Sequence, residues 1–293
     1  MFSIQTTHIS LRLGIARVSD LKHHEAIIPR KADHLVFHLR NWVRLQNPVI
    51  VDENLTVIDG HHRAHVLEKL SFQYIPICQI DYFNPAVQLR YWFRRIRNIV
   101  HADMLKRVIR DLDATLQPVA DRRELEKSLC KNRLHLGVEH KGGYYCISFP
   151  EQVVQDAVSA YCVTERIQSR LLQKGEEPEY IPCQSVLSGA CACRLAEDDL
   201  ILWTPRISKE MVVDAVARQQ CFSPKATRHL IPARPLNVNI PLHWLKGDIP
   251  LSTINSKFLA FLSGKGLKRF PPGQIIDGRY YQEELFVFVN KTG

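Results

Sequence analysis

The chain has 293 residues, which is enough for two domains or for one large one. Its apolar content of 45% and charged content of 24% are those of an ordinary globular protein, and no apolar run approaches the length of a membrane span. The first residues lack the basic and then apolar segments of a secretory signal, which predicts a cytoplasmic protein. A net charge of +9 favours a negatively charged partner, either a polyanion or a small phosphorylated ligand.

The first hundred residues predict a compact mixture of helices and strands. Apolar residues at three-to-four spacing predict a helix over 30–46, and two apolar runs around a polar tetrad predict a β-hairpin over 49–58. After an irregular or strand-like entry over 1–20, the remaining elements of this part are expected to be a helix over 64–70 and strands over 74–80 and 87–96.

The rest of the chain has a less regular pattern. Apolar periodicity predicts one long helical region over 102–131 that Pro118 interrupts, and frequent prolines after residue 220 predict loops and short strands. The other expected elements are helices over 151–173 and 208–219 and strands over 144–149 and 284–289. A weakly marked domain boundary is expected near residues 98–118.

The most informative stretch lies where the predicted hairpin ends. Its second strand stops at Asp59 and Gly60, so His61, His62 and Arg63 fall in the first turn of the helix that follows. A helix N-terminus has unpaired N–H groups and a positive dipole end, which suit a phosphate. The guanidinium and the imidazoles can donate to phosphate oxygens, and the Asp59 carboxylate could hold Mg²⁺. The alternative is a plain turn with histidines on the surface.

The eight cysteines do not follow a zinc-binding spacing. Cys191 and Cys193 form the one close pair, and with Cys183 they are a weak candidate for a metal site. In a reducing compartment most of the cysteines are expected to be buried as small hydrophobic residues.

Several short segments, in order along the chain, resemble one protein family. The turn at 59–63 is similar to that of the free L-serine kinase branch of the ParB/sulfiredoxin-like superfamily, and the resemblance extends over most of residues 15–289. The other segments that carry it are 21–25, 48–52, 89–92, 227–232, 234–238 and 278–281.

The resemblance implies an α+β protein. A ParB/sulfiredoxin-like nucleotide-binding α/β domain would span residues 1–100, and a mixed α/β domain over 101–293 would complete the serine site, with the active site in the cleft between them. Enzymes of this branch transfer a phosphoryl group from ATP or ADP to the hydroxyl of free L-serine, and the product feeds cysteine synthesis or siderophore assembly. Phosphoryl transfer of this kind implies Mg²⁺ as cofactor.

The resemblance also implies roles for single residues. Glu25 matches the catalytic glutamate and would be the general base, and Asp59 would ligate Mg²⁺ or hold the acceptor. Gly60, His61, His62 and Arg63 would bind the nucleotide phosphates, and Trp92, Thr227 and His229 would bind serine, with Arg228 and Arg234 as further ligands of phosphate or carboxylate. Each has a structural alternative, such as a solvated Glu25 or a Trp92 packed in the core.

Of two other readings of the superfamily, a ParB-like DNA-binding protein stays open and a sulfiredoxin-like reductase is nearly excluded. A ParB-like, nucleotide-dependent DNA-binding protein would suit the charge and the arginine-rich, aromatic stretch over 90–97, but no helix-turn-helix follows the first domain. Nucleic acid is therefore a less favoured partner. A sulfiredoxin-like reductase needs a cysteine after Gly60, where His61 stands. Homoserine and threonine are open as alternative acceptors, because specificity depends on the shape of the pocket.

Overall fold

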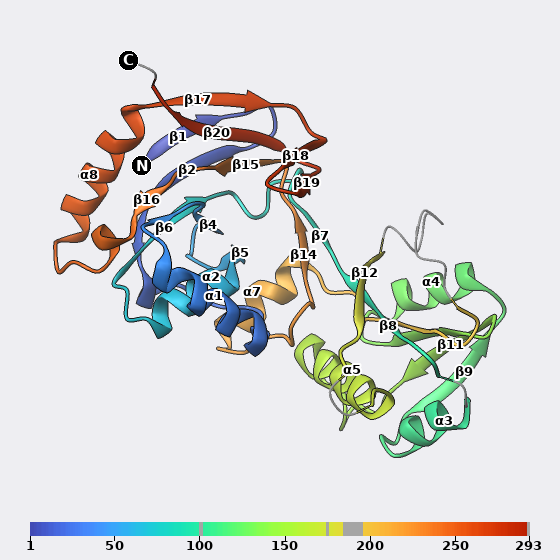
Figure 1. Ribbon diagram of the computed structural model, residues 1–293. Coiled ribbons are helices and arrows are strands. Elements are labelled where there is room, and N and C mark those ends of the chain that lie inside the picture. Colours follow the sequence, from blue (N-terminus) through green and yellow to red (C-terminus); the bar gives the residue numbers. More distant parts are fainter. Residues whose placement is uncertain (100–101, 174–175, 184–195, 292–293) are drawn as a thin grey trace. The chain divides into compact units, whose positions relative to one another are not determined.

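The computed structural model describes residues 1–99, 102–173, 176–183 and 196–291 (Figure 1). Contacts divide the chain into two compact units. Unit 1 comprises residues 1–88 and 229–293, and unit 2 comprises residues 89–228. The predicted division at residue 100 differs from this one, because the last 65 or so residues return to the first unit, and a local pattern along the chain does not reveal such a return.

Unit 1 is built on a five-stranded sheet with the strand order β1-β2-β6-β4-β5. The strands are β1 (Phe2–Gln5), β2 (Ser10–Arg17), β4 (Val49–Val51), β5 (Val57–Asp59) and β6 (Tyr74–Gln79). β4 runs parallel to β6, and the other neighbours are antiparallel. All three residues of β4 are buried valine or isoleucine, as expected for a strand inside a sheet. The predicted hairpin and the strand over 74–80 are confirmed.

The helices of this part of unit 1 follow the predicted positions closely. The predicted helix over 30–46 is α1 (Pro29–Asn41), which the short strand β3 (Arg44–Leu45) follows, and the helix predicted from residue 64 is α2 (His61–Lys69). α1 and α2 pack on each other, and a single 3-10 turn, η1 (Val18–Asp20), packs on α2. The segment between η1 and α1 is the loop that carries Glu25.

The carboxyl-terminal part of unit 1 adds a three-stranded sheet with the order β15-β20-β17. β15 pairs parallel with β20, and β17 pairs antiparallel with it. The elements of this part are β15 (Ala233–Leu236), β16 (Ile240–Pro241), η2 (Leu242–Leu245), α8 (Leu251–Ser263), β17 (Lys265–Phe270), β18 (Gln274–Ile276), β19 (Arg279–Tyr281) and β20 (Glu284–Asn290). β16 pairs with β3, and α8 packs against β2, so this part is tied to the amino-terminal part of unit 1 at two places.

The helix α8 corrects the prediction of loops and short strands after residue 220. Ile254, Phe258 and Leu262 lie at four-residue spacing and are fully buried, so the apolar pattern for a helix is present. Pro250 caps the start of this helix, where a proline ring clashes with nothing because no preceding turn exists. The abundance of prolines in this region therefore concealed a regular element.

Unit 2 contains a six-stranded antiparallel sheet with the order β12-β8-β13-β10-β11-β9. The strands are β8 (Trp92–Ile96), β9 (Thr115–Val119), β10 (Leu136–His140), β11 (Gly143–Ser148), β12 (Glu179–Pro182) and β13 (Leu200–Trp203). The helices are α3 (Ala102–Arg110), α4 (Arg122–Lys131), α5 (Ala157–Leu171) and α7 (Lys209–Ala217). The chain passes from one unit to the other within or beside β7 (Gln88–Arg90) and β14 (Arg228–Leu230).

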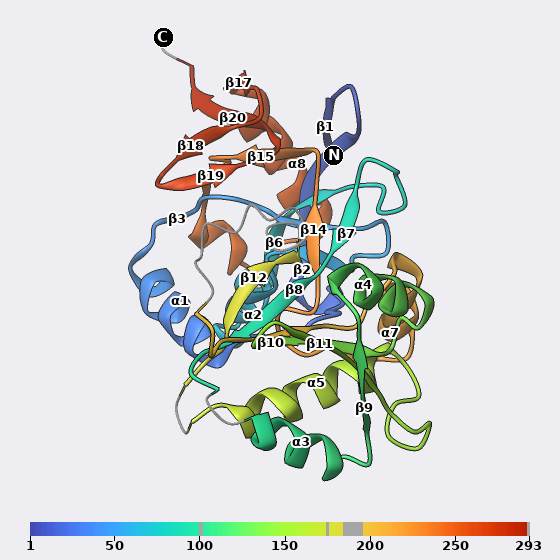
Figure 2. The ribbon, with the colours of Figure 1, turned by 90° about the vertical axis from the view of Figure 1, so that its right-hand side faces the viewer.

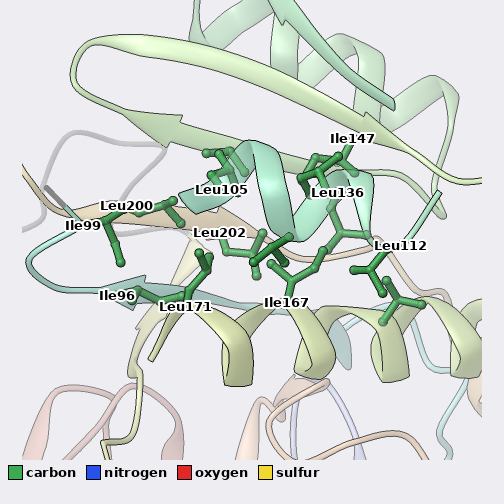
Figure 3. Packing of buried hydrophobic residues seen from close by; sticks show 14 of the residues in the cluster. Ile96, Ile99, Leu105, Leu112, Leu136, Ile147, Ile167, Leu171, Leu200 and Leu202 are labelled. Carbon is green, nitrogen blue, oxygen red and sulfur yellow. The ribbon is translucent and has the colours of Figure 1, made fainter. Parts of the chain in front are cut away.

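Helices cover both faces of this sheet, and alternate residues of β13 point to opposite sides. Leu200 and Leu202 belong to a buried cluster with α3 and α5 (Figure 3), whereas Ile201 and Trp203 pack with Leu125 of α4 in a second cluster. Figure 2 shows α3 and α5 below the strands β10 and β11, with α4 above them. The period of two along the strand thus builds two cores from one sheet.

The prediction of one long helical region over 102–131 is wrong, because the strand β9 separates the helices α3 and α4. α3 ends at Arg110, and Asp113 takes a left-handed conformation with φ of 52° before β9 begins. Pro118 then lies in β9, which is an edge strand of the sheet. Because an edge strand leaves one row of N–H groups unpaired, a proline is tolerated there, and it did not mark a helix interruption. None of the helices in the described part of the chain has the length and apolar character needed to cross a membrane.

Candidate active site

The predicted strand, glycine turn and helix start are confirmed at residues 57–63 of unit 1. β5 ends at Asp59, Gly60 caps the helix, and α2 begins at His61. Gly60 has φ of +104°, which residues with a Cβ rarely adopt, so the chain can turn sharply from the strand into the helix only because this residue is glycine. The turn thereby brings the side chains of residues 59 and 61–63 to one end of α2.

Gly60→Ala is expected to destabilise the protein by about 2–4 kcal/mol. A Cβ at this position would lie 2.8 Å from Cγ1 of Val49 and 2.8 Å from Nη2 of Arg63, and this crowding adds to the cost of the left-handed conformation. Gly278→Ala is the matched control, since Gly278 has φ of +75° and open space around the Cβ position. Urea denaturation measures both, and we expect a loss of only about 1 kcal/mol for the control. Equal losses would mean that crowding at Gly60 contributes nothing.

Asp59 is held by two arginines. Its Oδ2 lies 2.6 Å from Nη1 of Arg234 and 3.3 Å from Nη2 of Arg63. Arg234 also pairs through Nε with Glu283 at 2.7 Å, so its guanidinium bridges two carboxylates from distant parts of the sequence. Arg234 retains 10% of its side-chain exposure and Glu283 retains 15%, which makes this a largely desolvated ion-pair network.

The electrostatics of this network favour the charged forms of Asp59 and Arg234. Burial alone would raise the pKa of Asp59, but the charges of Arg234 and Arg63 and the hydrogen bond from Arg234 outweigh it and hold that pKa well below its ordinary value. Burial would likewise lower the pKa of Arg234, but its two carboxylate partners raise it. Asp59 is therefore an anion at pH 7, and guanidinium groups neutralise its charge.

The ion pairs of Asp59 affect its predicted role as a magnesium ligand. The magnesium role of Asp59 stays a prediction, and its two ion pairs weigh against it, because a cation would have to displace a guanidinium group. Within the described residues no group of three or more His, Cys, Asp or Glu side chains is arranged to hold a metal ion.

Cys191 and Cys193 lie outside the described residues. Of the six described cysteines, Cys78, Cys146 and Cys183 are buried and Cys130, Cys162 and Cys221 are exposed.

Arg63 bonds to three oxygen atoms of unit 1. Its Nη1 donates to the carbonyl oxygens of Asn47 at 2.8 Å and Pro48 at 2.9 Å, just before β4, while Nη2 faces Asp59. Arg63 thus ties the start of α2 to the entry of β4. Its role in binding phosphate stays a prediction.

Four histidines gather beside the turn. Nε2 of His61 lies 3.2 Å from Nδ1 of His24, and ring contacts join His61 to His23 and join His24 to His229. The hydroxyl of Tyr82 lies 2.8 Å from Nε2 of His229. Burial, followed by the neighbouring imidazoles, lowers the pKa of His61 well below its ordinary value, and burial lowers the pKa of His23 and of His24. His23, His24 and His61 are therefore neutral at pH 7.

Glu25 lies directly after this cluster in the loop before α1. The loop is pinned to the sheet by backbone bonds between Lys22 and the hairpin, from Lys22 N–H to the Leu55 carbonyl and from Val57 N–H to the Lys22 carbonyl. At its other end, the N–H group of Ile28 donates to Nε2 of His62 at 3.1 Å. Glu25 is half-buried between these anchors, in the same unit as Asp59, Gly60 and the histidines.

In unit 2 the structure brings two predicted serine ligands together. The indole Nε1 of Trp92 donates to the carbonyl oxygen of Thr227 at 3.0 Å, and Thr227 is buried. Lys225 and Arg228 lie over the indole ring at 5.0 Å and 5.3 Å from its centroid. Trp92 thus anchors the segment 225–228 and is not simply a core residue. His229 belongs to unit 1.

Two residues of these networks were missed by sequence reasoning. Glu283 completes the ion pairs of Arg234, and Tyr82 contacts His229 across 147 positions of the chain. Neither lies in a recognisable motif. Only the fold brings them to the site, so the one signal available was that Glu283 follows the matching segment 278–281 closely.

Comparisons with known proteins give a consistent result. No protein-family model matches the chain. An ATP-dependent L-serine kinase of Staphylothermus marinus is 27% identical over 239 residues, which cover 78% of this chain and 89% of the relative. An ADP-dependent L-serine kinase of Thermococcus kodakarensis is 23% identical over 239 residues, which cover 77% of this chain and 89% of the relative.

Solved structures have the same fold. A glutamate-to-alanine variant of a free serine kinase in complex with AMP has a TM-score of 0.64 and 18% identity, covering 83% of this chain and 97% of that one. SbnI from Staphylococcus aureus, with a C-terminal truncation, has a TM-score of 0.67 and 15% identity, covering 85% of this chain and 95% of that one. The α+β fold class and the resemblance to the free serine kinase branch are confirmed.

Proposed function

We propose that the chain is a nucleotide-dependent kinase that phosphorylates the hydroxyl of free L-serine and releases O-phospho-L-serine. The observation that carries the proposal is the joint agreement with L-serine kinases over more than three quarters of the sequence and over the fold. The turn at Gly60 supports it, since α2 begins with polar side chains at its positive end. The two relatives differ in their donor, so ATP and ADP are both candidates.

In the proposed reaction the serine oxygen attacks the terminal phosphorus of the nucleotide. A bond from that oxygen to phosphorus forms, the bond from phosphorus to the bridging oxygen breaks, and the hydroxyl proton passes to the carboxylate of Glu25. Glu25 is half-buried in a loop anchored on both sides, which suits a base that must keep its position. Backbone N–H groups at Gly60 and the first turn of α2, together with His61, would bind the donor phosphates.

The proposed reaction uses a divalent cation that binds together with the nucleotide phosphates. Mg²⁺ commonly binds through one or two carboxylates together with the phosphates of its nucleotide, and it neutralises their charge when bound. Asp59 is the carboxylate next to the start of α2, and its two ion pairs weigh against it as a metal ligand. In this proposal Asp59 instead orders Arg63 and Arg234 around the turn.

The finer parts of the proposal concern place and pathway. The enzyme would act in the cytoplasm, and its product would enter cysteine synthesis or siderophore assembly. Residues 1–88 would supply the nucleotide site, and Trp92 and Thr227 would bind serine, with His229 as a further ligand.

³¹P NMR of the purified protein with Mg²⁺ and L-serine, run separately with ATP and ADP, tests the function. We expect a new phosphomonoester signal that coincides with added O-phosphoserine, and the productive tube identifies the donor. Parallel tubes with homoserine and threonine test the acceptor. If no tube yields a phosphomonoester although the folded protein binds nucleotide, the proposal fails, and salt-dependent binding to duplex DNA would support the ParB-like alternative.

Trp92→Phe is expected to raise the KM for serine about five- to tenfold and to leave the KM for nucleotide within about twofold. The change keeps an aromatic ring but removes the donor to the buried Thr227 carbonyl, a bond worth about 1 kcal/mol. The segment 225–228 would then lose an anchor. Initial rates with either substrate varied measure both constants, and Trp244→Phe in unit 1 is the matched control. A rise in the nucleotide KM instead would contradict the assignment.

A further inference from the structure

Two adjacent histidines at the start of α2 hold the loop that carries Glu25. Nε2 of His61 contacts Nδ1 of His24, the residue before Glu25, at 3.2 Å. Nε2 of His62 accepts the N–H group of Ile28 at 3.1 Å, three residues after Glu25. The loop is thus attached to the helix start on each side of the carboxylate, although the two segments are more than thirty positions apart in the sequence.

The bond from Ile28 fixes the protonation of His62. A backbone amide can only donate, so Nε2 must offer its lone pair, and the imidazole must be neutral with its proton on Nδ1. In this form Nε2 is engaged by the loop, and Nδ1–H is the donor of the ring. The bond therefore gives His62 a structural role beside the predicted grip on the donor phosphates.

We propose that His62 is a positioning residue that holds residues 25–28 in place through the Ile28 amide and thereby aims the Glu25 carboxylate. This inference rests on the proposed function, in which Glu25 is the base. Ile28 is the residue that caps the start of α1, and its carbonyl accepts the first bonds of that helix, so its amide joins α1, the loop and α2 at one point. A displacement of about 1 Å in a reacting group can cost about a hundredfold in rate.

Two substitutions separate the positioning role from a phosphate grip. His62→Gln supplies a carbonyl acceptor at similar reach, whereas His62→Lys supplies a cation and donors but no acceptor. We expect the Gln variant to keep kcat within about threefold. The Lys variant should lose about 10- to 100-fold in kcat with the nucleotide KM within about threefold. The proposal is overturned if the Lys variant keeps kcat or if the Gln variant loses mainly nucleotide affinity.

Hydrogen exchange of the Ile28 amide, measured by ¹⁵N NMR, tests the contact without any activity. We expect exchange to be at least tenfold faster in His62→Lys than in wild type and nearly unchanged in His62→Gln. His34→Lys, the same change at an exposed position of α1, is the control and should leave the amide unchanged. Unchanged exchange in His62→Lys overturns the proposal. Absence of serine turnover in wild type overturns the proposed function instead, and the exchange result separates these two failures.

Discussion

Glu25→Gln is expected to lower kcat for serine phosphorylation by about 10²- to 10⁴-fold while nucleotide binding stays within about threefold of wild type. The amide has nearly the shape of the carboxylate but cannot take the proton of the serine hydroxyl. Glu25 lies in a loop rather than in the core, and its neighbours His24 and Ile28 are held through ring and backbone contacts that the substitution does not remove. Turnover by ³¹P NMR and nucleotide affinity by calorimetry measure the two quantities.

The matched control for this prediction is Glu53→Gln. Glu53 is an exposed glutamate in the β4–β5 turn of the same unit, and we expect its substitution to leave kcat unchanged within about twofold. The assignment of Glu25 as base is wrong if Glu25→Gln keeps full activity. Loss of both activity and nucleotide affinity would instead assign Glu25 to the nucleotide site.

The local part of the candidate site could be predicted from the sequence because its chemistry is contiguous. A strand, a glycine and a helix start follow one another over 57–63, and the conformation of Gly60 and the start of α2 are as the pattern indicates. The bonding of the side chains was not predictable in the same way. Arg63 donates to the carbonyl oxygens of Asn47 and Pro48, and His62 accepts from the Ile28 amide, and only the tertiary fold brings those backbone groups near. The phosphate roles of Arg63 and His62 stay predictions.

The sequence predicted the fold correctly where the pattern of an element is local. The prediction failed where the tertiary context decides the conformation of a segment. Pro118 lies in an edge strand and Pro250 caps a helix, and in both places the proline has a permitted position that its presence alone does not reveal. The return of residues 229–293 to unit 1 was likewise invisible, because β16 pairs with β3 and α8 packs on β2 across about 200 positions of the chain.

That return explains why a buried ion network forms around Asp59. β5 supplies Asp59, β15 supplies Arg234, and the turn before β20 supplies Glu283, so the network links the first sheet of unit 1 to its second. A buried pair of this kind adds little to stability compared with an apolar contact of equal size. Substitution of only one partner of the pair lowers the stability strongly, however, because the other charge then stays buried without its partner.

Arg234→Met is therefore expected to lower the free energy of unfolding at pH 7 by about 2–4 kcal/mol. One-sided loss of a fully buried pair costs about 3–5 kcal/mol, and the expected value is smaller because the Asp59 side chain keeps 36% of its exposure. Urea denaturation gives the value. Arg269→Met is the matched control: Arg269 pairs with Glu284 but is 61% exposed, so its loss should cost less than about 1 kcal/mol.

Acid should reduce this loss of stability, and the sign of the change follows from the depressed pKa of Asp59. In the wild type that pKa is depressed, so its contribution to stability is present above the unfolded value of about 4 and is lost as the pH falls below it. In Arg234→Met, burial is no longer outweighed by that cation and pushes the pKa of Asp59 upward, so protonation relieves the variant before the unfolded chain is protonated. The difference in unfolding free energy between wild type and variant should therefore shrink from pH 7 to pH 3. A difference that stays constant over this range would mean that Arg234 stabilises the fold through packing and not through Asp59.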